Sequence, residues 1–169
     1  MSALPKEAKI LKTLPVIIFS KLILKVWSLL ERIASKCKSA AIFPKANHLA
    51  CHWSVEIKYP DNITLGTGVV IGKMVTIGAL GGITLGNNVR ISKGATIESA
   101  SLDFSTPAPY KHNSKAIVIG NDVWIGSGAI ILAGVSLGDG TIVGAGTVVS
   151  KSLPSKSVCV GSPYRVLTK

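Results

Sequence analysis

Residues 117–151 read IVIGNDVWIGSGAIILAGVSLGDGTIVGAGTVVSK, and an aliphatic residue recurs in this stretch at every sixth position. The recurring residues are Ile119, Ile125, Ile131, Leu137, Val143 and Val149. Another apolar or small residue stands two positions before each of them, and a glycine or other small residue follows most of them. Side chains two residues apart lie on one face of an extended chain, and a small residue permits a tight bend. The stretch therefore predicts short strands separated by bends, with one strand and one bend in every six residues.

The same period continues toward the N-terminus. Six further registers fall at Leu65, Ile71, Ile77, Leu85, Ile91 and Ile97. Gly81-Gly82 inserts two residues between the third and fourth of these registers, and the spacing then resumes. Three strand-and-bend units close one triangular coil, so the twelve registers predict about four stacked coils around an aliphatic core. A β-sandwich fits the pattern less well, because sandwich strands recur every ~8–12 residues.

The composition agrees with a solenoid of short aliphatic strands. Apolar residues make up 47% of the 169 residues, aromatic residues only 5%, and glycine occurs 17 times. We expect an all-β protein with a parallel β-helix over residues 46–153, preceded by a helical arm at 1–45 and followed by a tail at 154–169. The chain contains three cysteines, an odd number, and their spacing does not match a metal-binding motif. We therefore expect reduced thiols.

The period is lost between Ile97 and Ile119. Residues 99–116 read SASLDFSTPAPYKHNSKA, a composition rich in Ser, Thr and Pro that is typical of a loop. A long loop inside a regular repeat is usually functional. This loop also contains His112, one of three histidines in the chain, so we expect it to form part of a functional site.

The repeat and its ending together resemble a known family. Residues 117–151, followed by Pro154 and the ending Val160-Gly161-Ser162-Pro163-Tyr164-Arg165-Val166, are similar to the C-terminal half of hexapeptide-repeat O-acetyltransferases. These enzymes include the maltose and galactoside acetyltransferases and polysaccharide-modifying relatives. The resemblance covers roughly residues 57–167. It implies a left-handed coil, a homotrimer, acetyl-CoA as the donor substrate and no metal.

The activity that the resemblance implies is transfer of an acetyl group to a hydroxyl of a saccharide or glycoconjugate. N-acetylation of an amino sugar and a non-catalytic β-helix that acts as a scaffold or binding protein are the alternatives. The zinc-dependent carbonic-anhydrase branch of these solenoids is disfavoured, because it needs three histidine ligands and the repeat region contains only His112. The motifs do not identify the acceptor, and they do not distinguish acetyl from longer acyl groups.

Direct transfer from a thioester needs a base that takes the proton of the attacking acceptor, and neutral imidazole suits this role. Our hypothesis for the base is His112. Many relatives carry His-Asp early in the loop, where this chain has Leu102-Asp103. Either the base has moved along the loop or the activity is lost, and we favour the first alternative. Asp103 would then orient the imidazole, as a carboxylate does for other catalytic histidines.

The resemblance also implies where the donor binds, in a groove between adjacent β-helices of the trimer. By motif, Trp124 and Ser127 would line this groove, and Ala145 would offer backbone contacts. Toward the nucleotide end, the expected contacts are Ser150, Lys151 and Arg165. Lys and Arg suit that end because the phosphates of the nucleotide are strongly anionic.

The arm is basic and amphipathic. Residues 1–45 contain nine Lys and Arg against two Glu, which accounts for +7 of the total net charge of +11. We expect a helix over Leu14–Ala34, in which Lys21, Lys25, Ser28 and Arg32 form a narrow polar stripe on an otherwise apolar surface. Further lysines precede this helix at Lys6, Lys9 and Lys12.

Two interpretations of the arm remain open. Residues 1–36 could lie in a membrane interface with their basic residues toward anionic headgroups, or the helix could cap the solenoid. A spanning helix is disfavoured, since a lysine at the bilayer centre costs about 2.5–3.5 kcal/mol. No nucleic-acid-binding module is evident, and no convincing cleavage site follows the apolar stretch. We expect a cytoplasmic protein, and under the first interpretation its arm would contact the inner face of the membrane.

Overall fold

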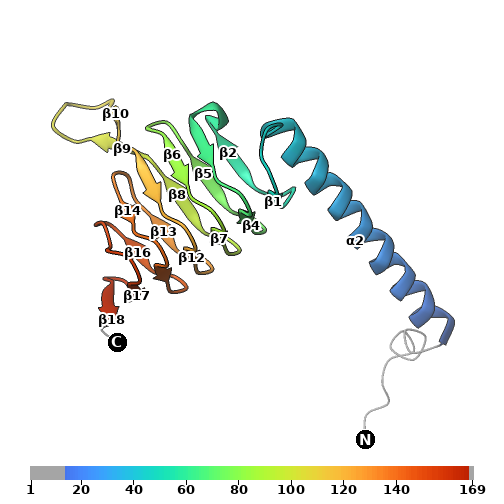
Figure 1. Cartoon of the computed structure of the whole chain (residues 1–169). Coiled ribbons are helices and arrows are strands. Elements are labelled where there is room, and N and C mark those ends of the chain that lie inside the picture. The colour runs from blue at the N-terminus through green and yellow to red at the C-terminus, as the bar shows by residue number, and fades with distance from the viewer. Residues whose placement is uncertain (1–13, 168–169) are drawn as a thin grey trace, which may run out of the picture.

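The computed structural model describes residues 14–167 and consists of one long helix followed by a solenoid of short strands (Figure 1). Helix α2 covers Leu14–Ile42, and the chain then winds through three sheets in turn. Neighbouring strands within each sheet come from successive coils and run parallel, apart from the last pair. The solenoid predicted from the period of six is therefore confirmed.

The first sheet contains β1 (Ala50–Cys51), β4 (Val70–Ile71), β7 (Arg90–Ile91), β12 (Trp124–Ile125), β15 (Ile142–Val143), β17 (Val158–Val160) and β18 (Arg165–Leu167). The second contains β2 (Glu56–Lys58), β5 (Thr76–Gly78), β8 (Thr96–Glu98), β13 (Ile130–Ile131) and β16 (Val148–Val149). The third contains β3 (Ile63–Leu65), β6 (Ile83–Leu85), β11 (Ile117–Ile119) and β14 (Ser136–Leu137). A short 3-10 turn, η1 (Pro60–Asn62), precedes β3.

The solenoid is longer at both ends than the twelve registers indicated. Cys51 and Ile57 begin an additional coil, but no small residue follows either of them, so the sequence pattern did not reveal it. At the other end, β17 pairs in parallel with β15, and β18 folds back antiparallel onto β17. Part of the segment 154–169, which the sequence assigned to a tail, is therefore β-sheet.

The core is a stack of aliphatic side chains inside the coils. The twelve register residues are buried apart from Leu65, which is partly buried against the core. Residues two positions earlier also face inward, including the polar Thr141, whose hydroxyl donates to the carbonyl oxygen of Gly138 at 2.7 Å. Apolar burial on this scale is the dominant favourable term for such a fold, at about 25 cal/mol per Å².

A ladder of amide and carboxylate side chains holds the bends between the third and first sheets. Oδ1 of Asn87 accepts from the backbone N–H of Thr67 at 2.9 Å, and Oδ1 of Asn121 accepts from that of Asn87 at 2.8 Å. Oδ1 of Asp139 likewise accepts from the backbone N–H of Asn121 at 2.7 Å. Each bend thus satisfies a backbone donor of the preceding coil, which fixes the stacking of the coils.

Helix α2 extends beyond the predicted Ala34 because nothing in the following residues breaks it before Pro44. Its C-terminal turns cover the first coil. Lys38 Nζ donates to the carbonyl oxygen of Trp53 at 2.9 Å and to that of Val55, and Ser35 Oγ accepts from the backbone N–H of Trp53 at 3.1 Å. The lysines that precede the helix in the sequence, Lys6, Lys9 and Lys12, lie outside the residues that the structure describes.

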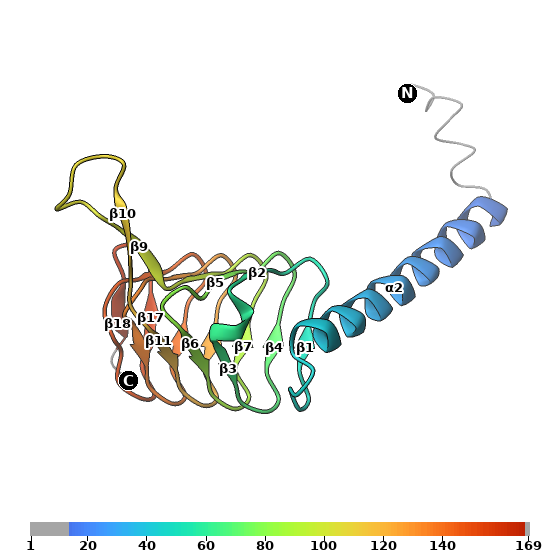
Figure 2. The ribbon, with the colours of Figure 1, turned by 90° about the horizontal axis from the view of Figure 1, so that it is seen from above.

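The N-terminal half of α2 runs away from the solenoid (Figure 2). Most of the large apolar side chains of this half and of the next two positions are about half exposed or more: Ile18, Phe19, Leu22, Ile23, Leu24, Val26, Trp27, Leu29 and Leu30. Within residues 14–167, no helix combines the length and the apolarity that crossing a bilayer requires. A large apolar surface of this kind normally marks an interaction site.

Candidate functional site

The loop that interrupts the repeat forms a hairpin that projects from the bend between the second and third sheets (Figure 2). Its strands are β9 (Ala100–Asp103) and β10 (Lys111–Ser114), paired antiparallel. The base of the hairpin is anchored by Ser99, which is fully buried. Ser99 Oγ donates to the carbonyl oxygen of Gly78 at 2.8 Å and accepts from the backbone N–H of Gly81 at 2.9 Å.

His112 lies on β10 directly opposite Leu102 on β9. Side chains of directly opposed residues lie on the same face of an antiparallel pair, with Cβ atoms about 4.5–5.5 Å apart. Both side chains are exposed. The resemblance stated above implies that Leu102 occupies the position of the histidine in many of those enzymes. The imidazole of this chain therefore stands one strand away from that position, on the same face of the hairpin.

Asp103 does not contact His112. Its register partner is Lys111, and adjacent residues of a strand point to opposite faces, so the carboxylate and the imidazole lie on opposite sides of the hairpin. The carboxylate instead accepts from Ser105, at 2.6 Å from Oγ and 3.0 Å from the backbone N–H. These two hydrogen bonds, the side-chain one first, hold the pKa of Asp103 below its ordinary value. The orienting role expected for Asp103 thus has no support in the geometry.

The exposed end of the hairpin carries an aromatic pair that the sequence analysis missed. The rings of Phe104 and Tyr110 meet edge to face, with centroids 5.2 Å apart, and Phe104 is 74% exposed. The only signal in the sequence was that two of nine aromatic residues fall within this loop.

Three of the residues expected to bind the donor lie along one edge of the solenoid. Trp124 points outward from the first sheet, is 54% exposed, and its Nε1 donates to Ser92 Oγ at 3.0 Å. Ser127 and Ala145 occupy successive coils at the bend between the first and second sheets, where the backbone N–H of Gly146 donates to the carbonyl oxygen of Ser127 at 2.9 Å. The three positions therefore lie on the first sheet and on the bend that follows it.

The other expected donor residues lie elsewhere on the chain. Ser150 and Lys151 follow β16 at the bend between the second and third sheets, the bend from which the hairpin also projects. Arg165 begins β18 at the C-terminal end of the solenoid. A single copy therefore presents the predicted donor residues on more than one edge.

A hollow of about 410 Å³ lies over the first sheet beside Trp124. Arg90, Trp124 and Ile142 stand in consecutive coils at the same register along this hollow, and Asp122 lines its side. Arg90 was not a candidate from the sequence. The sequence feature that could have identified Arg90 is its position between Val89 and Ile91, where a charged residue stands at an outward position of a strand.

Comparison with known proteins connects this architecture to a group of transferases. Residues 116–151 match the family described as "Bacterial transferase hexapeptide (six repeats)". The chain is 39% identical over 114 residues to the "Putative colanic acid biosynthesis acetyltransferase WcaF" of Escherichia coli K12, covering 68% of this chain and 62% of WcaF. The chain thus spans less than two thirds of the length of that relative.

A second relative is covered more fully, and a solved structure shares the fold. The "Putative acetyltransferase C18B11.09c" of Schizosaccharomyces pombe is 30% identical over 143 residues, covering 83% of this chain and 69% of that protein. A galactoside acetyltransferase solved in complex with coenzyme A superimposes with a TM-score of 0.67 at 30% identity, covering 73% of this chain and 63% of that one. The solenoid is accordingly a left-handed parallel β-helix.

The position of Asp103 can be tested by its titration. We expect Ser105→Ala to raise the pKa of Asp103 toward its ordinary value near 3.8, because both the hydroxyl donor and part of the turn geometry are lost. A carboxyl group whose pKa is lowered on folding stabilises the folded state at pH values above its ordinary pKa. This contribution to the free energy of unfolding is lost as the pH falls through the pKa of the folded state. Carboxyl-carbon NMR titration measures the shift.

His112→Ala is the matched control and should leave the pKa of Asp103 unchanged, since the two side chains lie on opposite faces. A rise in the Asp103 pKa of equal size in this variant would show that the carboxylate pairs with the imidazole after all.

Proposed function

Because the chain belongs to the hexapeptide-repeat acetyltransferases, we propose that it transfers an acetyl group from acetyl-CoA to a hydroxyl of a saccharide or glycoconjugate. The observation that carries the proposal is the pairing of His112 with Leu102 across the hairpin. It supports relocation of the base rather than its loss, because the imidazole faces the same side as the position it replaces. The family relationship supports the acetyl donor, since the related galactoside acetyltransferase binds coenzyme A.

The reaction is a direct attack on the thioester. Neutral His112 takes the proton of the acceptor hydroxyl as its oxygen bonds to the acetyl carbon. The C–S bond then breaks, and the imidazolium returns the proton to the leaving thiolate, so coenzyme A departs as the thiol. Backbone N–H groups at the bends are the natural donors to the transient oxyanion. His112 is well exposed, which leaves the imidazole accessible to both substrates.

We place the donor in a groove between neighbouring copies of a homotrimer. Trp124, Ser127 and Ala145 would line one wall, while Ser150, Lys151 and Arg165 would meet the nucleotide. Two observations support this arrangement. These residues lie on different edges of one copy, so a second copy is needed to bring them together. Outward apolar residues such as Leu132 and Ile142, each 39% exposed, also favour burial against a partner.

Removal of the imidazole should slow turnover strongly. With acetyl-CoA and a panel of sugars and amino sugars, we expect His112→Ala to release thiol about 10²- to 10⁴-fold more slowly than the wild type, the usual contribution of a general base. The double variant Leu102→His/His112→Leu, which moves the imidazole back across the hairpin, should retain activity within about tenfold. His48→Ala, outside the repeat, is the matched control.

Unchanged thiol release in His112→Ala would reject His112 as the base. Failure of the wild type to bind acetyl-CoA would instead favour a non-catalytic scaffold. The same panel distinguishes O-acetylation from N-acetylation, because it shows whether a sugar hydroxyl or an amino sugar is acetylated.

We further propose that α2 attaches the protein to the inner face of a membrane, which places the enzyme in the cytoplasm. The helix supports this contact in two ways. Its N-terminal half exposes large side chains such as Phe19 and Leu24, at 63% and 66%, and it carries Lys21 and Lys25 on one stripe. An interfacial helix buries such a surface at the edge of the acyl chains while its lysines meet anionic headgroups.

The membrane contact should depend on the apolar surface of the helix. We expect Phe19→Asp/Leu24→Asp to lower sedimentation with phosphatidylglycerol vesicles at least tenfold, because the variant places two charges where acyl chains would lie. Val118→Asp, at an exposed apolar position on the solenoid, should bind as the wild type does. Equal binding by all three proteins would contradict the membrane contact.

A further inference from the structure

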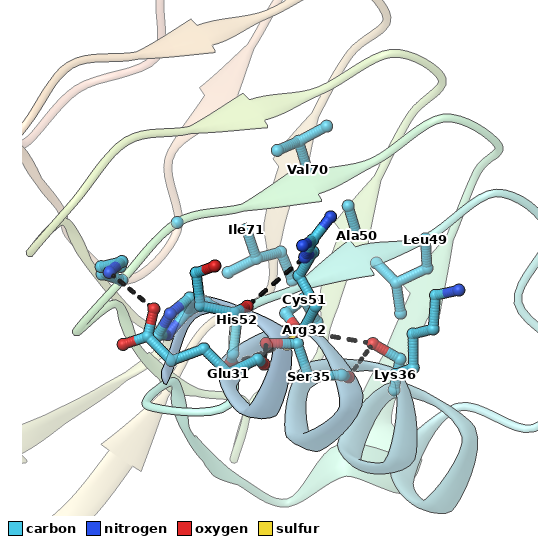
Figure 3. Close-up of a pocket in the computed structure, with 14 residues that line it drawn as sticks. Glu31, Arg32, Ser35, Lys36, Leu49, Ala50, Cys51, His52, Val70 and Ile71 are labelled. Atoms are coloured by element: carbon cyan, nitrogen blue, oxygen red, sulfur yellow. Dashed lines mark hydrogen bonds and ion pairs between the residues drawn. The ribbon is translucent and has the colours of Figure 1, made fainter. Parts of the chain in front are cut away.

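A groove of about 610 Å³ lies between the C-terminal half of α2 and the first two coils (Figure 3). Arg32 and Lys36 form part of its helical wall, and Arg32 extends toward Ala50 (Figure 3). The solenoid side supplies an apolar floor that includes Ala50, Val70 and Ile71, with Lys73 at its edge. The groove is therefore apolar along its floor and charged along its rim.

The charge of the rim is mainly positive. Lys73 Nζ lies 3.2 Å from Glu31 Oε2, and this contact lowers the pKa of Glu31 and keeps it ionised. Over residues 14–167, neither Arg32 nor Lys36 forms an ion pair. Both are exposed, and Arg32 uses only its Nε, which donates to the Ser28 carbonyl oxygen at 3.4 Å. A guanidinium beside an ammonium is the pairing that suits a phosphate group.

The position of the groove on α2 indicates where such a phosphate would come from. Arg32 and Lys36 continue the polar stripe of Lys21 and Lys25, and the remaining surface of the helix is apolar and exposed. If α2 lies in the membrane interface as proposed above, this stripe stands at the level of the lipid headgroups. The phosphate would then belong to a lipid whose chain follows the apolar surface of the helix.

The floor of the groove leads toward the proposed donor site. Ala50, Val70, Arg90 and Trp124 occupy the same register in consecutive strands of the first sheet. Neighbouring strands lie about 4.8 Å apart, so Val70 and Trp124 are separated by about 10 Å. A sugar attached to a phosphate in the groove would extend over Arg90 toward Trp124, where the hairpin of a neighbouring copy can meet it.

We infer that the acceptor is a saccharide carried on a lipid phosphate, and that Arg32 and Lys36 bind this phosphate. The inference rests on the proposed function, since it names the class of acceptor for the same reaction. The proposed occupant of the groove is therefore a lipid-linked phosphate. The test has to distinguish it from ordinary anionic phospholipid, which could also bind the two basic residues.

The test compares two kinds of phosphatidylcholine vesicle, one containing polyprenyl phosphate and the other phosphatidylglycerol, matched in surface potential. We expect the wild type to bind the polyprenyl phosphate vesicles more tightly. Arg32→Gln/Lys36→Gln should lose this preference, with a drop of at least tenfold on polyprenyl phosphate and a smaller one on phosphatidylglycerol. Lys21→Gln/Lys25→Gln removes equal charge from the same stripe outside the groove, and should weaken binding to both vesicles alike.

Equal losses on the two vesicles for both variants would mean that membrane charge alone attracts the helix, and would overturn the inference. Unchanged binding by Arg32→Gln/Lys36→Gln would overturn it too. Thiol release from acetyl-CoA with soluble sugars separates this result from the proposed function. A chain that acetylates soluble sugars but lacks the phosphate preference refutes the lipid-linked acceptor alone.

Discussion

Each coil of this solenoid has to bring its backbone within hydrogen-bonding distance of the next coil, and that spacing determines where every outward side chain can stand. Because the coils repeat in register, one inward aliphatic residue covers another, as Ile91 covers Ile71 and Ile125 covers Ile91. The bends must approach as closely as the strands. A Cβ on Gly86 would lie 2.7 Å from the backbone carbon of Gly120, so a side chain there would push the coils apart.

The same constraint leaves the chain most freedom where the repeat is interrupted or ends. A residue inside the ladder cannot move without disturbing two neighbouring coils, whereas the hairpin of β9 and β10 pairs only with itself. The side chains at positions 102 and 112 can therefore change places without affecting the core, since both positions are exposed. Helix α2 is similarly unconstrained beyond the turns that cover the first coil, and its N-terminal half is available for another surface.

The sequence could predict those parts of the fold that depend on local periodicity. Ile97 and Ile131 are buried as expected, because a period of six with alternate apolar residues has few other structural solutions. Cys51 and Ile57 escaped notice because stacking on later coils, and not a local glycine signal, makes them strands. The end of α2 could have been predicted, because no residue breaks the helix before Pro44, but its contacts with Trp53 could not, since they join positions distant in sequence.

The site was less predictable than the fold, because it depends on strand pairing. Asp103 and His112 lie in one loop, and only the register of the hairpin reveals that they face opposite sides. Arg90 joined the site only through its position beside Trp124 in the next coil. Likewise, the groove at Arg32 required knowledge of where α2 meets the first sheet.

A crystal structure of the full chain with coenzyme A would test the central claim most directly. The account predicts a trimer with the pantetheine arm along Trp124, Ser127 and Ala145. The thiol should lie within hydrogen-bonding reach of His112 from one of the two adjoining copies. A bound coenzyme whose thiol lies far from every His112 imidazole would contradict the account.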